Sequence, residues 1–286
     1  MELINKKQKV KKERLDVLVT NLGLAKSRTE AQNLIREGKI FVNNQKEDKP
    51  GTTIKEDSLV ELRGEKQKYV SRGGYKLEKA INIWNLDLND KVCMDVGSST
   101  GGFTDCMLQN GARKVYSIDV GTGQLDWSLR NNEKVVVLEQ TNARYIDKET
   151  INNDKIDFVS MDVSFISITK ILPAIYSIID EDTVFISLLK PQFEAEKEEV
   201  EKGGIIKDKK THEKIILNVV KYAKTSKFDI IDLSYSPIKG PSGNIEYLMY
   251  LRKSVDEGKA FVKNLDIEES AYIETVVKAS HEELDK

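Results

Sequence analysis

Cysteine is scarce in this sequence, because its 286 residues include only Cys93 and Cys106. Two cysteines cannot build the disulfide framework of a secreted domain or a zinc site made of cysteines. Both stand beside apolar residues, so we expect them to be small, buried core side chains. The low cysteine content therefore favours a cytoplasmic protein.

Histidine is equally rare, and His212 and His281 are the two examples. Both stand in charged segments that we predict to be surface helices. A catalytic triad or a metal centre built on histidine is therefore not expected, and we expect the protein to bind no metal.

Long apolar runs are also missing, since none approaches the ~18 residues that a membrane span requires. The first twelve residues contain five lysines, and no apolar stretch follows them. This pattern differs from that of a secretory signal. We expect no association with a membrane.

Charged residues are abundant, at 32% of the chain against 39% hydrophobic residues, as in a soluble globular protein. The length is sufficient for two domains. Residues 1–80 hold 19 Lys and Arg against 12 Asp and Glu, which leaves an acidic remainder in a chain of net charge −2. A basic module before an acidic body suggests that the first part binds a polyanion, although basic surfaces are common.

Residues 12–62 are predicted to form a compact α+β unit. Apolar residues at helical spacing predict two helices, the first ended by Gly23 and the second begun by a capping box at Ser27–Glu30. Residues 40–42 and 58–62 predict strands.

The order of residues in this unit resembles the RNA-binding domain named after ribosomal protein S-four. The resemblance rests on Arg14-Leu15-Asp16, Ser27-Arg28, Ala31, Leu34-Ile35, Gly38 and Ile40-Phe41-Val42-Asn43. It implies that basic side chains contact RNA phosphates, which position RNA without reading its sequence. The candidates are Arg14, Lys26, Arg28, Arg36 and Lys39, together with Arg72 from the segment that follows.

After a predicted linker at 64–74, strands and helices alternate. Strands are predicted at 92–96, 114–119, 135–138, 157–161, 183–189, 228–234 and 246–251, and helices at 75–84, 102–110, 166–179 and 211–225. This rhythm predicts an α/β fold with a doubly wound, mostly parallel, Rossmann-like sheet. The domains expected are thus 1–63 and 75–253, with a charged, helical extension at 254–286 to which we assign no chemistry.

A glycine-rich loop follows the first strand of this sheet, at Gly97–Gly102. Doubly wound folds bind nucleotide-like ligands at such strand ends. The spacing G-x-x-x-G-G differs from the dinucleotide fingerprint, and the lysine of a P-loop is missing. Asp119 ends the next strand, where a carboxylate can accept hydrogen bonds from ribose hydroxyls. The loop and this carboxylate together fit either NAD or S-adenosylmethionine as the cofactor. Asn142, further along the chain, would then lie beside the adenine of that cofactor.

Four charged residues stand at strand or helix ends around the same cleft, namely Lys76, Asp162, Lys190 and Glu246. Because the carboxyl ends of neighbouring strands converge, we expect Asp162 and Lys190 to be neighbours of the ligand. A lysine after a buried strand is partly desolvated and can act as a base, but nearby carboxylates oppose that effect. Each residue taken alone also fits a structural ion pair.

Four motifs together resemble the FtsJ-type ribose 2′-O-methyltransferases, and more closely the TlyA family, also called hemolysin A. They are Tyr69-Val70-Ser71-Arg72-Gly73-Gly74-Tyr75-Lys76-Leu77, Asp95-Val96-Gly97-Ser98-Ser99-Thr100-Gly101-Gly102-Phe103-Thr104-Asp105, Lys190-Pro191-Gln192-Phe193-Glu194 and Gly243-Asn244-Ile245-Glu246-Tyr247. The resemblance implies a class I rRNA (cytidine-2′-O)-methyltransferase that uses S-adenosylmethionine, the cofactor also favoured by an acid at position 95.

This resemblance assigns roles to the residues of the cleft. Lys190, oriented by Asp162 and Glu246, would activate the ribose hydroxyl, and Lys76 would position that ribose or stabilise the oxyanion. The cofactor would contact Asp95, Gly97, Ser98, Ser99, Thr100, Gly101, Gly102, Phe103, Asp119, Val120, Asn142 and Asp162.

The expected partner is ribosomal RNA or a ribosomal subunit, and a monomer is favoured. Members of the family differ in the subunit they modify, so the subunit and the cytidine stay open. A non-catalytic RNA-binding or ribosome-assembly protein is the main alternative, although the four charged residues are intact. A membrane-damaging toxin, as the name hemolysin suggests, is opposed by the absence of a signal or span, and an NAD-dependent oxidoreductase by the loop spacing.

Overall fold

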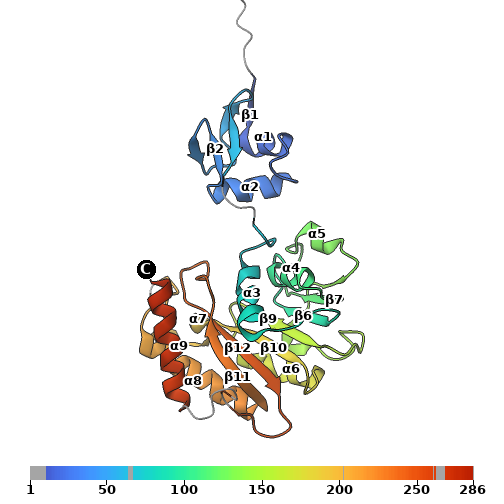
Figure 1. Ribbon diagram of the computed structural model, residues 1–286, viewed down its shortest axis with the longest axis vertical. Helices are drawn as coiled ribbons and strands as arrows, with labels where there is room; N and C mark the ends of the chain where they lie inside the picture. The colour runs from blue at the N-terminus through green and yellow to red at the C-terminus, as the bar shows by residue number, and fades with distance from the viewer. Residues whose placement is uncertain (1–10, 64–66, 202, 260, 262–267, 286) are drawn as a thin grey trace, which may run out of the picture. The chain divides into compact units, whose positions relative to one another are not determined.

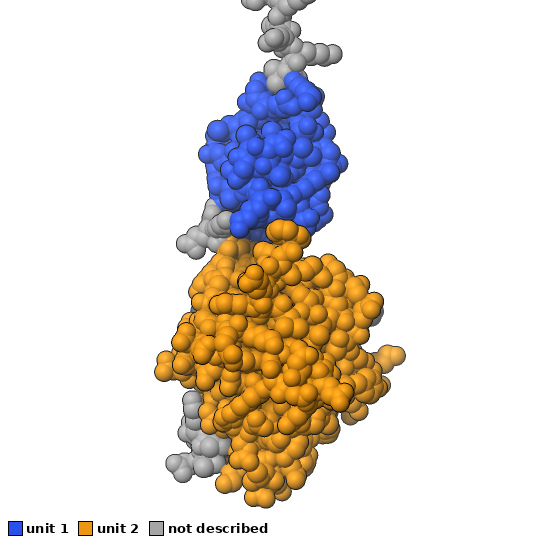
Figure 2. All heavy atoms as spheres, turned by 90° about the vertical axis from the view of Figure 1, so that its right-hand side faces the viewer, with its two compact units in different colours: residues 1–66 blue, residues 67–286 orange. Residues whose placement is uncertain are grey.

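A computed structural model describes residues 11–63, 67–201, 203–259, 261 and 268–285. The chain divides into two compact units, residues 1–66 and 67–286 (Figure 2). The lysine-rich first ten residues, part of the expected linker at 64–66 and part of the expected extension at 262–267 lie outside the described residues. Residues 67–74 of that linker belong to the second unit, where Tyr69 is buried.

The first unit is a small α+β domain. Helices α1 (Leu15–Asn21) and α2 (Arg28–Arg36) pack through a core cluster that includes Leu15, Val19 and Ile35. The strands are β1 (Lys12–Arg14), β2 (Ile40–Val42), β3 (Gln45–Glu47), β4 (Thr53–Lys55) and β5 (Val60–Leu62). Strand β1 pairs with β4, while β2 lies between β3 and β5.

The start of α2 differs in one detail from the predicted capping box. The Ser27 hydroxyl accepts from the Glu30 amide at 3.2 Å, but the Glu30 carboxylate accepts from the amide of Lys26 instead of Ser27. Three strands, β1, β3 and β4, were not predicted. They are three residues long and mostly polar, so backbone pairing with a partner strand specifies them and a hydrophobic period does not.

The second unit is built on a seven-stranded sheet in the order β11-β12-β10-β9-β6-β7-β8 (Figure 1). Its strands are β6 (Val92–Val96), β7 (Lys114–Ile118), β8 (Val135–Leu138), β9 (Phe158–Met161), β10 (Val184–Leu189), β11 (Phe228–Tyr235) and β12 (Tyr247–Lys253). All neighbours pair in parallel except β12, which is antiparallel to both β10 and β11. The predicted Rossmann-like, mostly parallel sheet is thus confirmed.

Helices cover both faces of this sheet. They are α3 (Gly73–Trp84), α4 (Gly102–Gln109), α5 (Trp127–Arg130), α6 (Leu172–Ile178), α7 (Pro191–Glu194), α8 (Lys209–Thr225) and α9 (Glu269–Leu284), with short 3-10 turns η1 (Ala143–Tyr145), η2 (Ile168–Lys170) and η3 (Lys197–Glu199). Side chains of α6, α8 and α9 share one core cluster, and those of α3 and α4 share the other.

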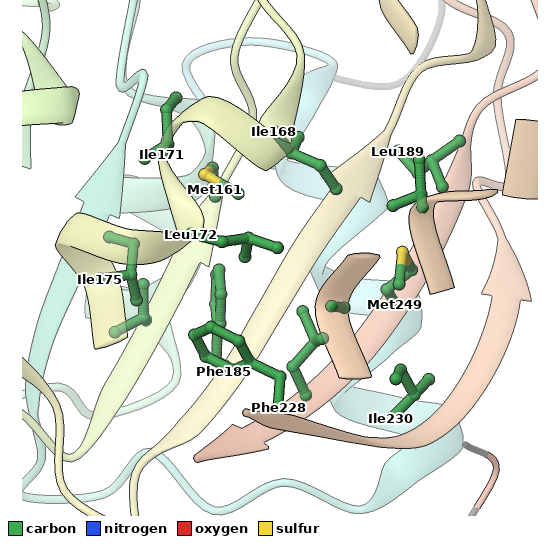
Figure 3. Packing of buried hydrophobic residues seen from close by; sticks show 14 of the residues in the cluster. Met161, Ile168, Ile171, Leu172, Ile175, Phe185, Leu189, Phe228, Ile230 and Met249 are labelled. Atoms are coloured by element: carbon green, nitrogen blue, oxygen red, sulfur yellow. The ribbon is translucent and has the colours of Figure 1, made fainter. Parts of the chain in front are cut away.

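Successive side chains along each strand point alternately into these two cores, because the sheet is buried on both faces. Along β12, Tyr247 and Met249 join the first core, whereas Leu248 and Tyr250 join the second. Figure 3 shows Phe185 of β10 packed beside Phe228 in the first core. Both cysteines are fully buried, as predicted.

The strand order reverses between β6 and β9, because the chain proceeds from β6 toward β8 and then returns to the other side with β9 and β10. Loops that leave two such strands run in opposite directions and leave a crevice at their carboxyl ends. This reversal places the loop after β6 beside the segment after β9.

The helix predicted at 166–179 is interrupted, which corrects that prediction. Phe165 adopts a positive φ of 63°, η2 follows it, and α6 begins afresh at Leu172. Pro173 stands in the first turn of α6, where its missing amide hydrogen costs no helical hydrogen bond. The apolar periodicity was continuous, but proline and the left-handed residue set the true start.

The prediction that both histidines lie on surface helices was wrong. His212 on α8 is fully buried and His281 on α9 is 6% exposed, with ring centroids 5.1 Å apart. Helix α9 lies along α8 and contacts β11, so the residues of the predicted extension complete the first core (Figure 1). In the described part of the chain, no helix is long and apolar enough to cross a bilayer.

Two hydrogen bonds fix the tautomer of the buried His212 ring. Nε2 lies 3.1 Å from the Ile206 carbonyl, which can only accept, so Nε2 carries the proton and Nδ1 accepts from the Tyr247 hydroxyl at 2.7 Å. Burial lowers the pKa of His212 to about 4. The unfolded chain protonates this residue near pH 6.5, so its contribution to stability is lost as pH falls from 6.5 to 4.

We expect His212→Gln to remove this pH dependence. The difference in free energy of unfolding between the wild type and the variant should shrink by roughly 3 kcal/mol between pH 7 and 4. The comparison is needed because Asp95, whose pKa burial raises to about 7, adds stability on acidification in both proteins. Urea unfolding followed by fluorescence reports the second unit, which contains Trp84 and Trp127. A constant difference across this range would contradict the assignment.

Candidate active site

The glycine loop after β6 approaches the backbone beyond β9 too closely for any side chain at Gly97. This residue has φ +85°, and a Cβ atom there would lie 2.5 Å from the Asp162 carbonyl oxygen. Gly101, at φ +96°, caps α4 under the side chains of Leu125 and Leu129. Glycine is therefore needed at both positions, for conformation and for space.

Backbone hydrogen bonds fix this loop against the end of β7. The amides of Gly97 and Ser98 both donate to the Ile118 carbonyl, at 2.8 and 3.1 Å. The Asp119 carboxylate accepts from the Ser99 amide through one oxygen and from the Gly121 amide through the other, each at 2.7 Å. Each oxygen keeps a lone pair, so Asp119 can both shape the loop and accept from a ligand.

Asp95 lies beneath the loop and not on its surface. Its side chain is fully buried, and Oδ2 accepts from the amide and the hydroxyl of Thr104 at 2.9 and 2.7 Å. The Ser160 hydroxyl donates to the other oxygen at 3.2 Å, so the carboxyl ties β6 to α4 and β9. Burial raises the pKa of Asp95 to about 7, although these hydrogen bonds oppose the rise.

The other residues predicted to contact a cofactor occupy different depths. Val120 is 72% exposed beside Asp119, while the Phe103 ring is buried in the core shared by α3 and α4. Asn142 is half-buried at the end of β8, where its side chain accepts from the Arg144 amide. Ser98 is buried, and Ser99 has a positive φ of 47°. The Thr100 carbonyl accepts from the Asp126 amide.

The four predicted charged residues converge into one cluster. Lys190 Nζ lies 2.6 Å from Asp162 Oδ1, and Lys76 Nζ lies 3.4 Å from Asp162 Oδ2 and 2.6 Å from Glu246 Oε2. The exposed side-chain fractions are 8% for Lys76, 18% for Asp162, 9% for Lys190 and 1% for Glu246. Asp162 and Lys190, which follow adjacent parallel strands, therefore contact each other directly.

The elements around the cluster explain its geometry. Asp162 and Lys190 end the parallel pair β9 and β10, and Glu246 precedes β12, which enters antiparallel from the same edge. The backbone of Gly240 packs directly against the Glu246 carboxylate, because a Cβ atom at Gly240 would lie 2.4 Å from Glu246 Oε1. Lys76 reaches the cluster from the first turn of α3.

Charge compensation within the cluster is uneven. Burial alone would lower the pKa of Lys76, but Asp162 and Glu246 outweigh it and raise that pKa, so Lys76 stays an ammonium. Burial would raise the pKa of Asp162, but the two lysines lower it. For Glu246, burial together with Asp162 prevails and raises the pKa.

The sequence analysis assigned no role to several residues that lie next to this cluster. The Ser164 hydroxyl accepts from Lys190 Nζ at 2.9 Å. Phe165 is 91% exposed and its ring lies 5.1 Å from that of Phe193. The Glu194 carboxylate accepts from the Ser167 hydroxyl and the Ile168 amide. An aromatic residue three positions after each of Asp162 and Lys190 was the available signal.

Two of the basic residues predicted in the first unit, Arg14 and Arg28, are held by Asp16, which was not predicted to have a role. Asp16 is fully buried, and its carboxylate accepts two hydrogen bonds from Arg14 at 3.0 Å and one from Arg28 at 2.9 Å. Gln32 adds a fourth at 2.9 Å. Lys26 and Arg36 are exposed, and Lys39 pairs with Glu37 at 3.0 Å. Arg72 stands at the start of α3 in the second unit.

Metal ligands do not gather in this site. Within the described ranges, no group of three or more histidine, cysteine, aspartate or glutamate side chains is arranged to hold an ion. The arrangement instead offers a glycine-lined strand end with a carboxylate beside it, and next to that a lysine–carboxylate cluster. Such a site can hold a nucleotide-like group and can move a proton at a lysine amine.

Comparison with known proteins agrees with this division. Residues 69–253 match the FtsJ-like methyltransferase family, and residues 13–60 match the S4 domain family. Hemolysin A of Brachyspira hyodysenteriae is 45% identical to this chain, covering 83% of the chain and 98% of that protein. The 16S/23S rRNA (cytidine-2′-O)-methyltransferase TlyA of Mycobacterium tuberculosis is 39% identical, covering 85% of this chain and 91% of its own length.

A solved structure extends the agreement to the fold. A protein from Streptococcus thermophilus that is named as a hemolysin is 41% identical and superposes with a TM-score of 0.75. The match covers 97% of this chain and 98% of that one. The similarity therefore spans both units.

Proposed function

The chain belongs to the TlyA family, in which an S4 domain precedes an FtsJ-like methyltransferase domain, and we propose that it methylates the 2′-hydroxyl of a cytidine in ribosomal RNA. The observation that carries this proposal is the buried cluster of Lys76, Asp162, Lys190 and Glu246 beside the glycine loop. The methyl donor is S-adenosylmethionine, and the place of action is the cytoplasm, where ribosomal RNA is found. We favour a monomer.

The residues of the loop suit this donor. Glycine at position 97 lets the loop lie against the backbone after β9, where a Cβ atom would be 2.5 Å from the Asp162 carbonyl oxygen, and the loop so shaped would hold the amino-acid end of the donor. Asp119 would accept from the ribose hydroxyls, and Val120 and Asn142 would flank the adenine. Asp95 and Phe103 would act from below by fixing the loop, because their side chains are buried. When bound, S-adenosylmethionine supplies an electrophilic methyl group.

The two lysines of the cluster have different roles in the proposed reaction. Lys76 faces two carboxylates, so it serves as a permanent cation that stabilises negative charge on the ribose oxygen. Lys190 faces one carboxylate and the neutral Ser164, and in its uncharged form it accepts the proton of the 2′-hydroxyl. The freed oxygen would then take up the methyl group that bound S-adenosylmethionine supplies. Asp162 and Glu246 orient both amines.

The exposed ring of Phe165 is the surface on which we place the target nucleoside. Because Lys190 is buried, we expect the target ribose to come from a nucleotide that has left its stack, which costs a few kcal/mol. Stacking on an aromatic ring offsets roughly 1–3 kcal/mol of that cost. Phe165 directly follows Ser164, which contacts Lys190, so it lies where an extruded base would arrive.

The first unit would hold RNA through Arg14 and Arg28, which Asp16 presents to solvent with side chains 47% and 54% exposed. We expect Asp16→Asn to weaken RNA binding about tenfold, because charge-assisted hydrogen bonds worth about 1.5–3 kcal/mol each are lost. Filter binding to ribosomal RNA at two salt concentrations measures this loss, which should shrink at high salt. Asp48→Asn removes an exposed acid of the same unit and serves as control. Unchanged affinity in a folded Asp16→Asn protein would contradict this role.

The test of the proposed function is methyl transfer from labelled S-adenosylmethionine to purified small subunits, large subunits or naked ribosomal RNA. We expect label in RNA and none in ribosomal protein. Binding of these acceptors without transfer of label would favour an assembly or RNA-binding protein instead. Comparison of the separate subunits also identifies the one that is modified.

A further inference from the structure

Both polar partners of Lys190 Nζ belong to the segment that follows β9. Asp162 Oδ1 lies 2.6 Å and the Ser164 hydroxyl 2.9 Å from this amine. The direction in which the amine presents its remaining hydrogen or lone pair therefore depends on the path of residues 162–164. A small displacement of that segment would turn the amine away from a ribose hydroxyl.

This segment does not follow a relaxed path. Phe165, the next residue, has φ +63°, a conformation that costs a non-glycine residue about 1–3 kcal/mol and persists only when its surroundings enforce it. The Phe165 ring is 91% exposed, so burial of the ring does not enforce it. The constraint must act on the chain at both ends of the segment.

The two ends are held by different means. At the near end, the Asp162 amide donates to the Val96 carbonyl at 2.9 Å, which continues the sheet. At the far end, Glu194 accepts from the Ser167 hydroxyl at 2.5 Å and from the Ile168 amide at 2.8 Å. Glu194 ends α7, and Lys190 is the N-cap residue of the same helix. Lys190 and the carboxylate that holds the segment of its partners therefore belong to one short element.

We propose that Glu194 is a positioning residue for the reaction, which sets the orientation of the Lys190 amine by anchoring residues 162–168 to α7. The inference rests on the proposed function. Glu194 itself contacts neither the amine nor the cluster in this arrangement, and it acts through Ser164 and Asp162. The same anchor holds Phe165 beside Phe193, so it also fixes the ring on which the base would stack.

The experiment compares Glu194→Ala, Glu194→Gln and Ser167→Ala in the full chain with the wild type. We expect Glu194→Ala to lower kcat at least tenfold, while the affinity for S-adenosylmethionine changes less than twofold. Glutamine can still accept from the Ile168 amide and can donate to Ser167, so Glu194→Gln should recover most of kcat. Ser167→Ala removes one of the two bonds and should give an intermediate kcat. Isothermal titration measures cofactor affinity, and thermal unfolding reports folding.

Glu199→Ala is the matched control, because this glutamate caps η3 and pairs with Lys214 at 2.8 Å, away from the cluster. It should keep wild-type kcat. A wild-type kcat in Glu194→Ala, or no recovery in a folded Glu194→Gln protein, would overturn the positioning role. A fall in kcat matched by equal losses in cofactor affinity and melting temperature would also overturn it. Failure of the wild type to methylate RNA would instead refute the proposed function.

Discussion

Replacement of Lys190 by methionine should abolish methyl transfer, with kcat reduced by roughly 10²–10⁴, the range that positioned general bases contribute. Methionine retains much of the volume of the buried side chain but cannot accept a proton. Asp162 keeps Lys76 as a partner at 3.4 Å, so its charge is not left alone. Affinity for S-adenosylmethionine should stay within about threefold, because the glycine loop is untouched. Single-turnover kinetics and isothermal titration measure the two quantities separately.

The control for this variant is Lys114→Met, which breaks another lysine–aspartate pair in the same unit. Lys114 lies 2.7 Å from Asp154 at the amino end of β7, the edge of the sheet opposite the cluster. We expect wild-type kcat from it. If Lys190→Met transferred methyl groups within tenfold of the wild-type rate, Lys190 could not be the proton acceptor.

Gly97→Ala should weaken cofactor binding by at least 100-fold. The added Cβ would lie 2.5 Å from the backbone oxygen of Asp162, and neither strand end can shift without breaking the bonds that shape the loop. A residue with a side chain also pays about 1–3 kcal/mol for the positive φ at this position. Titration with S-adenosylmethionine and thermal unfolding measure the two effects.

The variant Gly123→Ala separates the effect of backbone strain at a positive φ from the effect of a steric clash of the new Cβ atom. Gly123 also has a positive φ, +66°, but nothing lies within 4 Å of a Cβ atom built there. This variant should lose only the stability that the strained φ costs, about 1–3 kcal/mol, and keep its affinity for S-adenosylmethionine. Equal cofactor affinities in Gly97→Ala and Gly123→Ala would mean that the close approach of the loop to Asp162 plays no part in binding.

The sequence predicted the sheet and the charged cluster because both depend on local patterns. Short apolar strands separated by turns are recognisable one at a time, and parallel strands bring their carboxyl ends together. These two rules are enough to place Asp162 and Lys190 at the same edge of the sheet, but not to predict their ion pair. Glu246 was assigned to the site only through the resemblance to a family motif. It precedes β12, which is antiparallel to β10, so the convergence of carboxyl ends does not apply to it.

Other features depend on tertiary contacts that no local pattern encodes. His212 stands among charged residues on α8, yet α9 returns over it from residues 269–284 and buries it. Asp95 precedes the glycine loop in the sequence, but Thr104 and Ser160 enclose its carboxyl. The positive φ of Phe165 precedes an apolar period that the structure divides into η2 and α6, and the anchor that we propose for it, Glu194, belongs to a different helix.

Nucleoside analysis of ribosomal RNA tests the central claim most directly. Ribosomal subunits that lack the modification are incubated with the protein and S-adenosylmethionine, and the RNA is digested to nucleosides for mass spectrometry. We predict that 2′-O-methylcytidine accumulates with the wild type and does not accumulate with Lys190→Met. A methyl group on a base, on a nucleoside other than cytidine, or on no RNA at all would contradict the account.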